Sequence, residues 1–139
     1  MLDECYVAAG GAATMNRAPI RTSRVMELSR ARIATTSPEA LKPDSLDAFN
    51  RLSADSATSI YGGDCHNYAL LAAGHVDIVL EDGLATHDIM GVVEVIRAAG
   101  GIVTDKTGAA VTMQGTDSLL AASTPELHAA ALALVGKSG

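Results

Sequence analysis

The sequence has few cysteines and no long uncharged apolar run. Its two cysteines, Cys5 and Cys65, lie far apart and form no C-x-x-C pair, which argues against a disulfide framework and against a zinc site. No apolar run approaches the ~20 residues that a membrane-spanning helix needs. The N-terminus also lacks the basic segment and apolar stretch of a signal peptide. We therefore expect a cytoplasmic protein with reduced thiols and no membrane partner.

Basic residues are also few. Ten Lys and Arg stand against sixteen Asp and Glu, for a net charge of -6, and the basic residues are scattered rather than gathered in a stripe. Because nucleic-acid affinity comes mainly from clustered Lys and Arg, we expect no nucleic-acid partner. An acidic chain can still bind a small phosphorylated molecule through backbone N–H groups and through metal ions that acidic side chains hold.

The remaining composition is that of a globular chain. With 48% hydrophobic residues in 139, the sequence can form the core of one domain or of a piece of a larger one. Residues 4–23 predict two short strands around a Gly-rich turn, and 30–37 predict a third strand. Ser45 is a candidate cap for a helix through Leu46, Phe49 and Leu52.

From residue 57 onward, predicted strands and helices alternate. Strands are expected in 57–63, 76–81, 102–105 and 118–123, with a further short one after the turn at 107–111. Helices are expected in 64–74, 88–99 and 124–136, and the apolar character of 88–99 predicts that it is buried between layers. Thr124 or Ser123 is the expected cap of the last helix, with Pro125 in its first turn. This alternation predicts an α/β fold in which helices cover a sheet.

Two strand-to-helix loops, "YGGDC" and "LATHD", are candidate sites because helix N-termini present unpaired N–H groups. Asp88 is either an N-cap or a metal ligand. Glu81 is either a solvated strand-end residue or an acceptor for substrate hydroxyl or ammonium groups. Asp82 is expected to be a turn residue, and His87 is the only histidine expected near a site.

In the first loop, Gly62 and Gly63 could let the backbone approach a ligand, or they could form a plain turn into a helix capped by Asp64. The sequence contains no G-x-S-x-G elbow and no P-loop. Nothing in it therefore indicates covalent catalysis.

The stretch "YGGDCHNYALLAAGHVDIVLEDGLATHDIMGVVEVIRAAGGIVTDKTG" resembles the inositol monophosphatase family of magnesium-dependent, lithium-sensitive phosphatases. Within the family, "GGDCHNYALLAAGHVD" is most similar to the histidinol-phosphatase branch, which carries an aromatic residue before "ALLA", as Tyr68 does here. "YVAAGGAATMNRAPIRTS" resembles the family's hairpin and "LLAASTPELHAAALALV" its last strand and helix. The chain therefore resembles roughly the C-terminal half of a family member.

This resemblance implies a layered helix–sheet sandwich with an N-terminal β-hairpin from the family's first sheet. Residues 1–36 would belong to that first sheet, and 37–139 would form the C-terminal α/β lobe. By position, Asp88 is similar to the aspartate on the family's distal Mg²⁺, and Glu81 to the acid that contacts the organic part of the substrate. Gly62, Gly63 and Asp64 would line the same pocket, where Asp64 and Glu81 could meet an ammonium or imidazole group.

The resemblance also implies an activity, hydrolysis of histidinol phosphate by a metal-activated water. Inositol monophosphate or another sugar phosphate is the alternative substrate, and a non-catalytic, partner-binding fragment is the alternative class. The family's D-P-x-D-G-T motif, which carries the main metal ligands, has no counterpart in this sequence. We therefore expect the chain to be inactive alone, because it is truncated, because a partner chain supplies the N-terminal half, or because the fragment has lost activity. Family members are commonly dimers, so the resemblance also implies a homodimer.

Overall fold

The computed structural model describes residues 3–112, 114 and 116–136, and it describes only the backbone of Thr86 and Asp88. The helices are η1 (Leu28–Arg30), η2 (Pro38–Ala40), α1 (Pro43–Asp55), α2 (His66–Ala72), α3 (Thr86–Ala98) and α4 (Pro125–Val135). The strands are β1 (Tyr6–Ala9), β2 (Ala12–Met15), β3 (Ala18–Pro19), β4 (Arg32–Thr35), β5 (Thr58–Tyr61), β6 (Ile78–Asp82), β7 (Ile102–Thr104) and β8 (Ser118–Ala122). None of these helices is long and apolar enough to cross a membrane.

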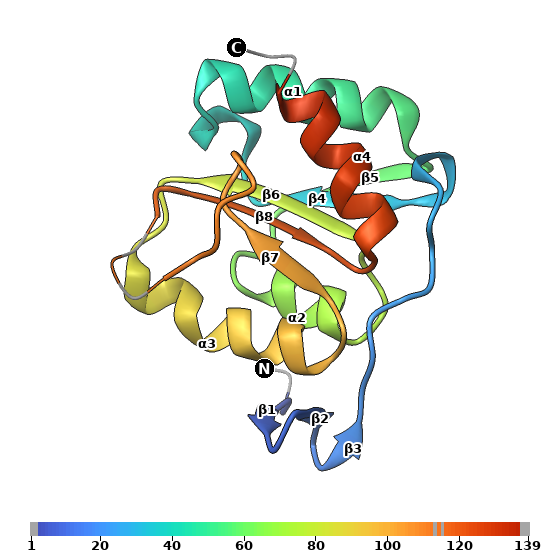
Figure 1. Ribbon diagram of the computed structural model, residues 1–139, viewed down its shortest axis with the longest axis vertical. Helices are drawn as coiled ribbons and strands as arrows, with labels where there is room; N and C mark the ends of the chain where they lie inside the picture. Colours follow the sequence, from blue (N-terminus) through green and yellow to red (C-terminus); the bar gives the residue numbers. More distant parts are fainter. Residues whose placement is uncertain (1–2, 113, 115, 137–139) are drawn as a thin grey trace.

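The strands form two sheets. The larger sheet has the order β5-β4-β6-β8-β7, in which β5, β4 and β6 are parallel and β8 runs antiparallel to both of its neighbours. Strands β1, β2 and β3 form a small antiparallel sheet below α3 (Figure 1). The predicted α/β sandwich with an N-terminal hairpin is therefore confirmed.

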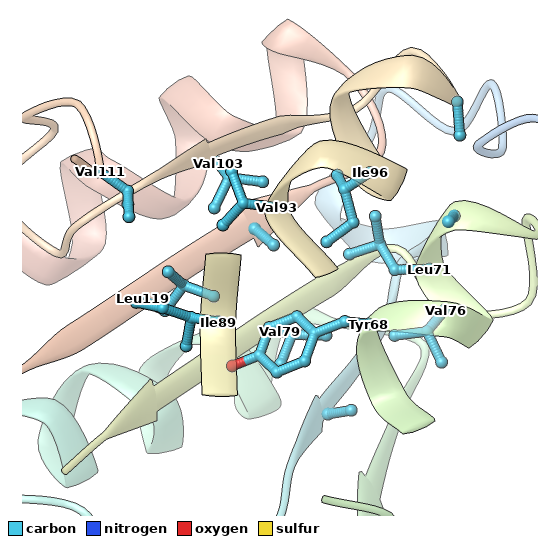
Figure 2. Packing of buried hydrophobic residues seen from close by; sticks show 14 of the residues in the cluster. Tyr68, Leu71, Val76, Val79, Ile89, Val93, Ile96, Val103, Val111 and Leu119 are labelled. Atoms are coloured by element: carbon cyan, nitrogen blue, oxygen red, sulfur yellow. The ribbon is translucent and has the colours of Figure 1, made fainter. Parts of the chain in front are cut away.

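Helices cover both faces of the larger sheet, α1 and α4 on one face and α2 and α3 on the other (Figure 1). Side chains of β6 alternate between the two faces, as the period of a strand requires. Ile78 and Leu80 pack with α1 and α4, whereas Val79 packs with α2 and α3. The core against α2 and α3 (Figure 2) includes these side chains: Tyr68, Leu71, Ile89, Val93, Ile96 and Leu119.

Helix α3 lies between the larger sheet and the hairpin, and contacts β1, β2 and β7. This position confirms the burial that its apolar sequence predicts. Helix α4 also begins as expected, because the Thr124 hydroxyl accepts a hydrogen bond from the Leu127 N–H at 3.3 Å and Pro125 occupies the first turn.

Three predicted caps are wrong. Pro43 starts α1 two residues before Ser45, so Ser45 lies inside the first turn. Asp64 has a positive φ of 46°, outside the extended region that an N-cap occupies, and Cys65 takes the N-cap position of α2. Helix α3 begins at Thr86, which places Asp88 in its first turn rather than at its cap.

Two predicted strand placements also differ from the structure. Residues 32–35, assigned to the first sheet with the rest of 1–36, form β4 in the centre of the larger sheet, paired with β5 and β6. Three successive residues of β4, Ile33, Ala34 and Thr35, are buried, as in a strand covered on both faces, whereas the hairpin strand β1 alternates between half-buried and exposed residues. The strand expected after the 107–111 turn is reduced to one bridge between Thr104 and Ala110.

A buried ion pair fixes the amino end of β6. Asp77, which precedes β6, is fully buried and accepts hydrogen bonds from Arg32 at its N–H (2.8 Å), Nε (2.9 Å) and Nη2 (3.1 Å). The Ser23 hydroxyl donates to the same carboxylate, and Arg32 also donates to the Gly74 carbonyl at 2.9 Å. This network ties the segment between the hairpin and β4 to the larger sheet.

Candidate functional site

The chain connections create a crevice at the carboxyl ends of β4 and β6. Strand β4 leads through α1 to β5 on one side, whereas β6 leads through α3 to β7 on the other. Neighbouring strands whose connections diverge in this way leave a gap between the helices on the two faces, and ligands of α/β sheets bind there. Topology alone therefore marks this edge as the candidate site.

A pocket of about 390 Å³ occupies the crevice. Thr35 and Asp82 line it from the α1 face of the sheet, and Tyr68 and Glu81 from the α2 face. Asp64, from the Gly-rich loop, adds a third carboxylate, and the described lining residues include no Lys, Arg or His. Such a lining favours a cation or a hydrogen-bond donor over a free anion.

Glu81 is held firmly at the end of β6. Its side chain is only 6% exposed, and one carboxylate oxygen accepts hydrogen bonds from the Thr36 hydroxyl and from the Thr36 N–H (3.0 Å). The other oxygen accepts from the Tyr68 hydroxyl at 2.8 Å. The sequence left two roles open for Glu81, a solvated strand-end residue or a binding residue. Its burial excludes the first.

Tyr68 donates to Glu81 from the first turns of α2. Burial, and then the adjacent negative charge of Glu81, raise the pKa of the Tyr68 phenol well above its usual value. The phenol therefore stays protonated and keeps its donor role at all physiological pH values. Tyr68 fixes the carboxylate orientation while its ring packs in the core (Figure 2).

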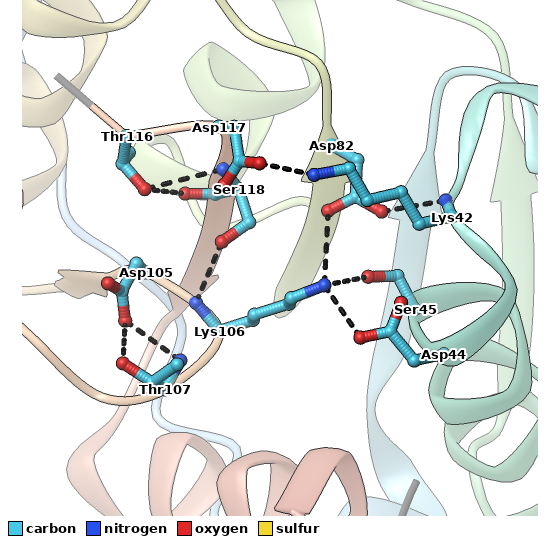
Figure 3. Close-up of polar contacts among 10 residues, drawn as sticks. All are labelled: Lys42, Asp44, Ser45, Asp82, Asp105, Lys106, Thr107, Thr116, Asp117 and Ser118. Carbon is cyan, nitrogen blue, oxygen red and sulfur yellow. Dashed lines mark hydrogen bonds and ion pairs between the residues drawn. The ribbon is translucent and has the colours of Figure 1, made fainter. Parts of the chain in front are cut away.

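Asp82 is buried, with a side chain 1% exposed. Its Oδ2 accepts a hydrogen bond from the Lys42 N–H at 2.8 Å. Its Oδ1 has no hydrogen-bond partner, and the Lys106 Nζ lies 3.9 Å away (Figure 3). The prediction that Asp82 is a turn residue is wrong, because β6 continues through it and pairs it with Ser118 of β8.

Lys106 reaches this end of β6 from the loop after β7. Its ammonium group donates to Asp44 Oδ2 at 2.8 Å and to the Ser45 hydroxyl at 3.2 Å, both in the first turn of α1 (Figure 3). A second pair, Lys42 with Asp117, links the start of α1 to the residue before β8. These contacts join the start of α1 to the loop after β7 and to the residue before β8.

The Gly-rich loop contributes through its shape. Gly62, Gly63 and Asp64 have consecutive positive φ values of 83°, 99° and 46°. The Asn67 side chain donates to the Gly62 carbonyl at 2.8 Å, and a Cβ on Gly63 would lie 2.5 Å from the Asn67 Oδ1. The loop thus brings Asp64 to the pocket wall, whereas the two glycines shape the turn behind it.

The metal prediction rests on Asp88, whose side chain lies outside the described part of the structure. Its backbone is in the first turn of α3, next to Ile89, which lines the pocket. Within residues 3–112, 114 and 116–136, no group of three or more His, Cys, Asp or Glu side chains is placed to hold a metal ion. Since Mg²⁺ needs several oxygen ligands, the described residues do not form a magnesium site by themselves.

A second pocket of about 450 Å³ lies between β1, α2 and α3. Cys65 and Tyr68 line both pockets and so form part of the wall between them. His87, expected near the site, lines this second pocket, where His66 lies 4.0 Å from Glu4. His87 therefore faces away from the crevice at β6.

Sequence reasoning missed Thr35, Thr36 and Asp82. The two threonines follow a buried strand and carry no pattern of their own, because their role depends on β4 lying beside β6. One signal was available, since polar residues directly after a buried parallel strand mark the ligand edge of an α/β sheet. Applied to "IATTS" as well as to "VLED", it would have found all three.

A sequence model of the inositol monophosphatase family matches residues 1–139. The bifunctional phosphatase IMPL2 of Arabidopsis thaliana is 37% identical over 88% of this chain and 36% of its own length. A histidinol-phosphatase of Chlorobaculum parvum is 29% identical over 77% of this chain and 42% of its own. An inositol monophosphatase from Zymomonas mobilis, of known structure, is 30% identical with a TM-score of 0.91, over 96% of this chain and 53% of its own. The chain spans about half the length, or less, of these relatives.

Proposed function

The chain belongs to the inositol monophosphatase family, and on that premise we propose that it supplies the substrate-binding lobe of a magnesium-dependent phosphomonoesterase for histidinol phosphate. The observation that carries the proposal is the charge of the pocket. Asp64, Glu81 and Asp82 line it together, and no Lys, Arg or His is among its described lining residues. Lys106, which approaches Asp82 to 3.9 Å from outside this lining, offsets only part of the negative charge. A substrate with a protonated amine suits these carboxylates, whereas the hydroxyl groups of inositol carry no compensating charge.

The same pocket implies that the phosphate group needs a cation. Three carboxylates repel a phosphate dianion, and the described part of the lining offers no Lys or Arg to offset that repulsion. We assign Asp88 as one magnesium ligand and place the other ligands in a part of the enzyme outside this sequence. Bound magnesium would offset the phosphate charge. The described residues position the organic part of the substrate, with Glu81 as its fixed acceptor.

Inositol phosphate is the second candidate substrate, because the Zymomonas mobilis relative of known structure is an inositol monophosphatase. A neutral polyol could donate hydroxyl groups to Glu81. It would bring no positive charge to Asp64 or Asp82, and Lys106 offsets only part of the charge of Asp82. We therefore rank histidinol phosphate first, as the name of the Chlorobaculum parvum relative also favours.

The test is phosphate release from histidinol phosphate and from inositol 1-phosphate in the presence of Mg²⁺. The chain is assayed alone and together with the portion of the Chlorobaculum parvum relative that has no counterpart in it. We expect no release from the chain alone, and release from the mixture that prefers histidinol phosphate. Asp88→Asn should abolish release, whereas the control Asp117→Asn, at an exposed carboxylate, should preserve it.

Two outcomes would contradict the proposal. Equal or faster hydrolysis of inositol 1-phosphate would overturn the substrate assignment while leaving the phosphatase activity. Release that survives Asp88→Asn would overturn the metal assignment. If no mixture releases phosphate from either substrate, the alternative of a non-catalytic binding module is favoured.

A further inference from the structure

Two buried polar atoms on the pocket wall lack hydrogen-bond partners. They are Thr35 Oγ1 and Asp82 Oδ1, and no other side-chain nitrogen or oxygen in the described part of the chain is both buried and unpaired. An unpaired buried polar atom costs about 1–3 kcal/mol, more when it is charged. The two residues that carry these atoms line the same pocket, which points to a ligand that completes them.

The two side chains lie on neighbouring strands and on the same face of the sheet. Ile33 of β4 pairs with Ile78 of β6, and the alternation along each strand places Thr35 and Asp82 on the α1 face with them. Glu81 lies on the opposite face and already accepts three hydrogen bonds from Thr36 and Tyr68. The two residues at the end of β6 therefore differ. Both carboxylate oxygens of Glu81 accept hydrogen bonds from the protein, whereas only one oxygen of Asp82 does.

Lys106 does not fill this gap. Its Nζ is 3.9 Å from Asp82 Oδ1, beyond hydrogen-bond distance, and donates to Asp44 and Ser45 instead. It offsets part of the Asp82 charge and leaves the oxygen free to accept a hydrogen bond. Among the described residues no group of three metal-ligating side chains is placed to hold a metal ion, so Thr35 and Asp82 do not form a metal site with their described neighbours.

We infer that Asp82 and Thr35 form a subsite that binds a primary ammonium group on the organic part of the substrate. This inference rests on the proposed function and deepens it, since it assigns substrate selection to two residues besides Glu81. An ammonium group has three N–H donors, which can be shared between two neighbouring acceptors. The two N–H groups of an imidazolium ring point apart, so the ring cannot serve both acceptors in the same way.

The test compares two ligands that differ only in the amine, L-histidinol and 3-(1H-imidazol-4-yl)propan-1-ol. Dissociation constants are measured by NMR titration of the 139-residue chain. The wild-type chain should bind L-histidinol about tenfold more tightly than the amine-free alcohol, as one charge-assisted hydrogen bond allows. Asp82→Asn should remove this ratio, and Thr35→Val should reduce it by a smaller factor.

Lys106→Met should change the affinity ratio between the two ligands in the opposite direction. It removes the cation that shares Asp82 with the ligand, so the ratio should rise. Asp117→Asn is the matched control, because it removes an exposed carboxylate that pairs with Lys42 in the same network, and the ratio should stay unchanged. The amide spectrum of each variant shows whether it is folded. If Asp82→Asn does not fold, the affinity ratio of Thr35→Val tests the inference in its place.

A ratio near one in the wild-type chain would overturn the inference. So would a ratio that survives Asp82→Asn, or a ratio that falls equally in Asp82→Asn and Lys106→Met. Failure of the substrate assignment is seen separately, in the phosphate-release assay. An amine-dependent ratio that needs Asp82 would stand even if histidinol phosphate were not the substrate.

Discussion

Strand β6 has a buried aspartate at each end, and the two differ in how the protein treats them. At the amino end, each oxygen of Asp77 accepts two hydrogen bonds, all from Arg32 and Ser23. At the carboxyl end, Asp82 has one oxygen bonded to the Lys42 N–H and one without a partner. A carboxylate that is fully paired stabilises the fold, whereas one left half-open is available to a ligand.

The largest expected effect is that of Asp77→Asn on stability. The substitution removes the charge that pairs with Arg32 and should lower the free energy of unfolding by about 3 kcal/mol. Asp82→Asn should change it by less than about 1 kcal/mol, because the amide oxygen can still accept from Lys42. Urea denaturation followed by circular dichroism measures both. Equal losses of unfolding free energy in the two variants would contradict the difference between the two ends of β6.

The loop at the carboxyl end gives the next largest effect. Gly63→Ala should destabilise the chain by about 2 kcal/mol, because it adds a Cβ at a positive φ and forces that Cβ against Asn67. Gly62→Ala is the matched control, since its φ is also positive but no atom lies within 4 Å of the added Cβ. It should cost about 1 kcal/mol. The opposite order would contradict the contact with Asn67.

Tyr68→Phe tests how much the hydrogen bond from the Tyr68 phenol to Glu81 contributes to stability. Loss of the 2.8 Å hydrogen bond to the carboxylate should lower the free energy of unfolding by about 1.5 kcal/mol. Tyr61→Phe, in a side chain that is 56% exposed, should change it by less than about 0.5 kcal/mol. The same denaturation experiment measures both variants, and a loss in Tyr61→Phe alone would be inconsistent with the burial of Tyr68.

The smallest expected effect is a pH dependence at the amino end of β6. Burial alone would raise the pKa of Asp77, but hydrogen bonds from Arg32 and Ser23 outweigh it and lower the pKa below its usual value. The stabilisation is therefore complete above the pKa of the unfolded chain and is lost as the pH falls through the lower, folded-state pKa. The stability difference between wild type and Asp77→Asn should shrink as acid is added. A difference that is constant down to pH 2 would contradict the pairing.

His128 provides an independent acid-sensitive group. Burial lowers the pKa of its imidazole, which lies 2.8 Å from the Thr104 hydroxyl. Protons then bind the unfolded chain more readily, so stability falls as the pH drops below the usual histidine pKa and levels off below the folded-state pKa. His128→Gln should flatten this part of the profile without altering the part that depends on Asp77.

Much of the fold could be predicted from the sequence. The alternation of apolar strands and helices after residue 57 indicated the layered sandwich, and Thr124 with Pro125 gave the start of α4. The helix starts at Asp64 and Asp88 were wrong because Asp is favoured both as a cap and inside the first turn, and local sequence does not separate the two. Strand β4 was placed in the wrong sheet because parallel pairing joins segments far apart in sequence.

The candidate site was predicted less completely. Glu81 and Asp64 do line one pocket, whereas Gly62 and Gly63, which the resemblance placed there too, are not among its described lining residues. Asp82 was taken for a turn residue because it precedes Gly83, and only its pairing with Ser118 shows that the strand continues. The roles of Thr35 and Lys106 depend on contacts with β6 from other parts of the chain, which no local pattern specifies.

The central claim is that ligands bind at the carboxyl ends of β4 and β6. The most direct measurement is the mapping of backbone amide chemical shifts in the 139-residue chain during titration with L-histidinol. Shifts should concentrate at Thr36, Glu81 and Asp82, around the pocket at the end of β6. Shifts confined to Arg32 and Asp77, or to the second pocket around His66, would contradict the claim.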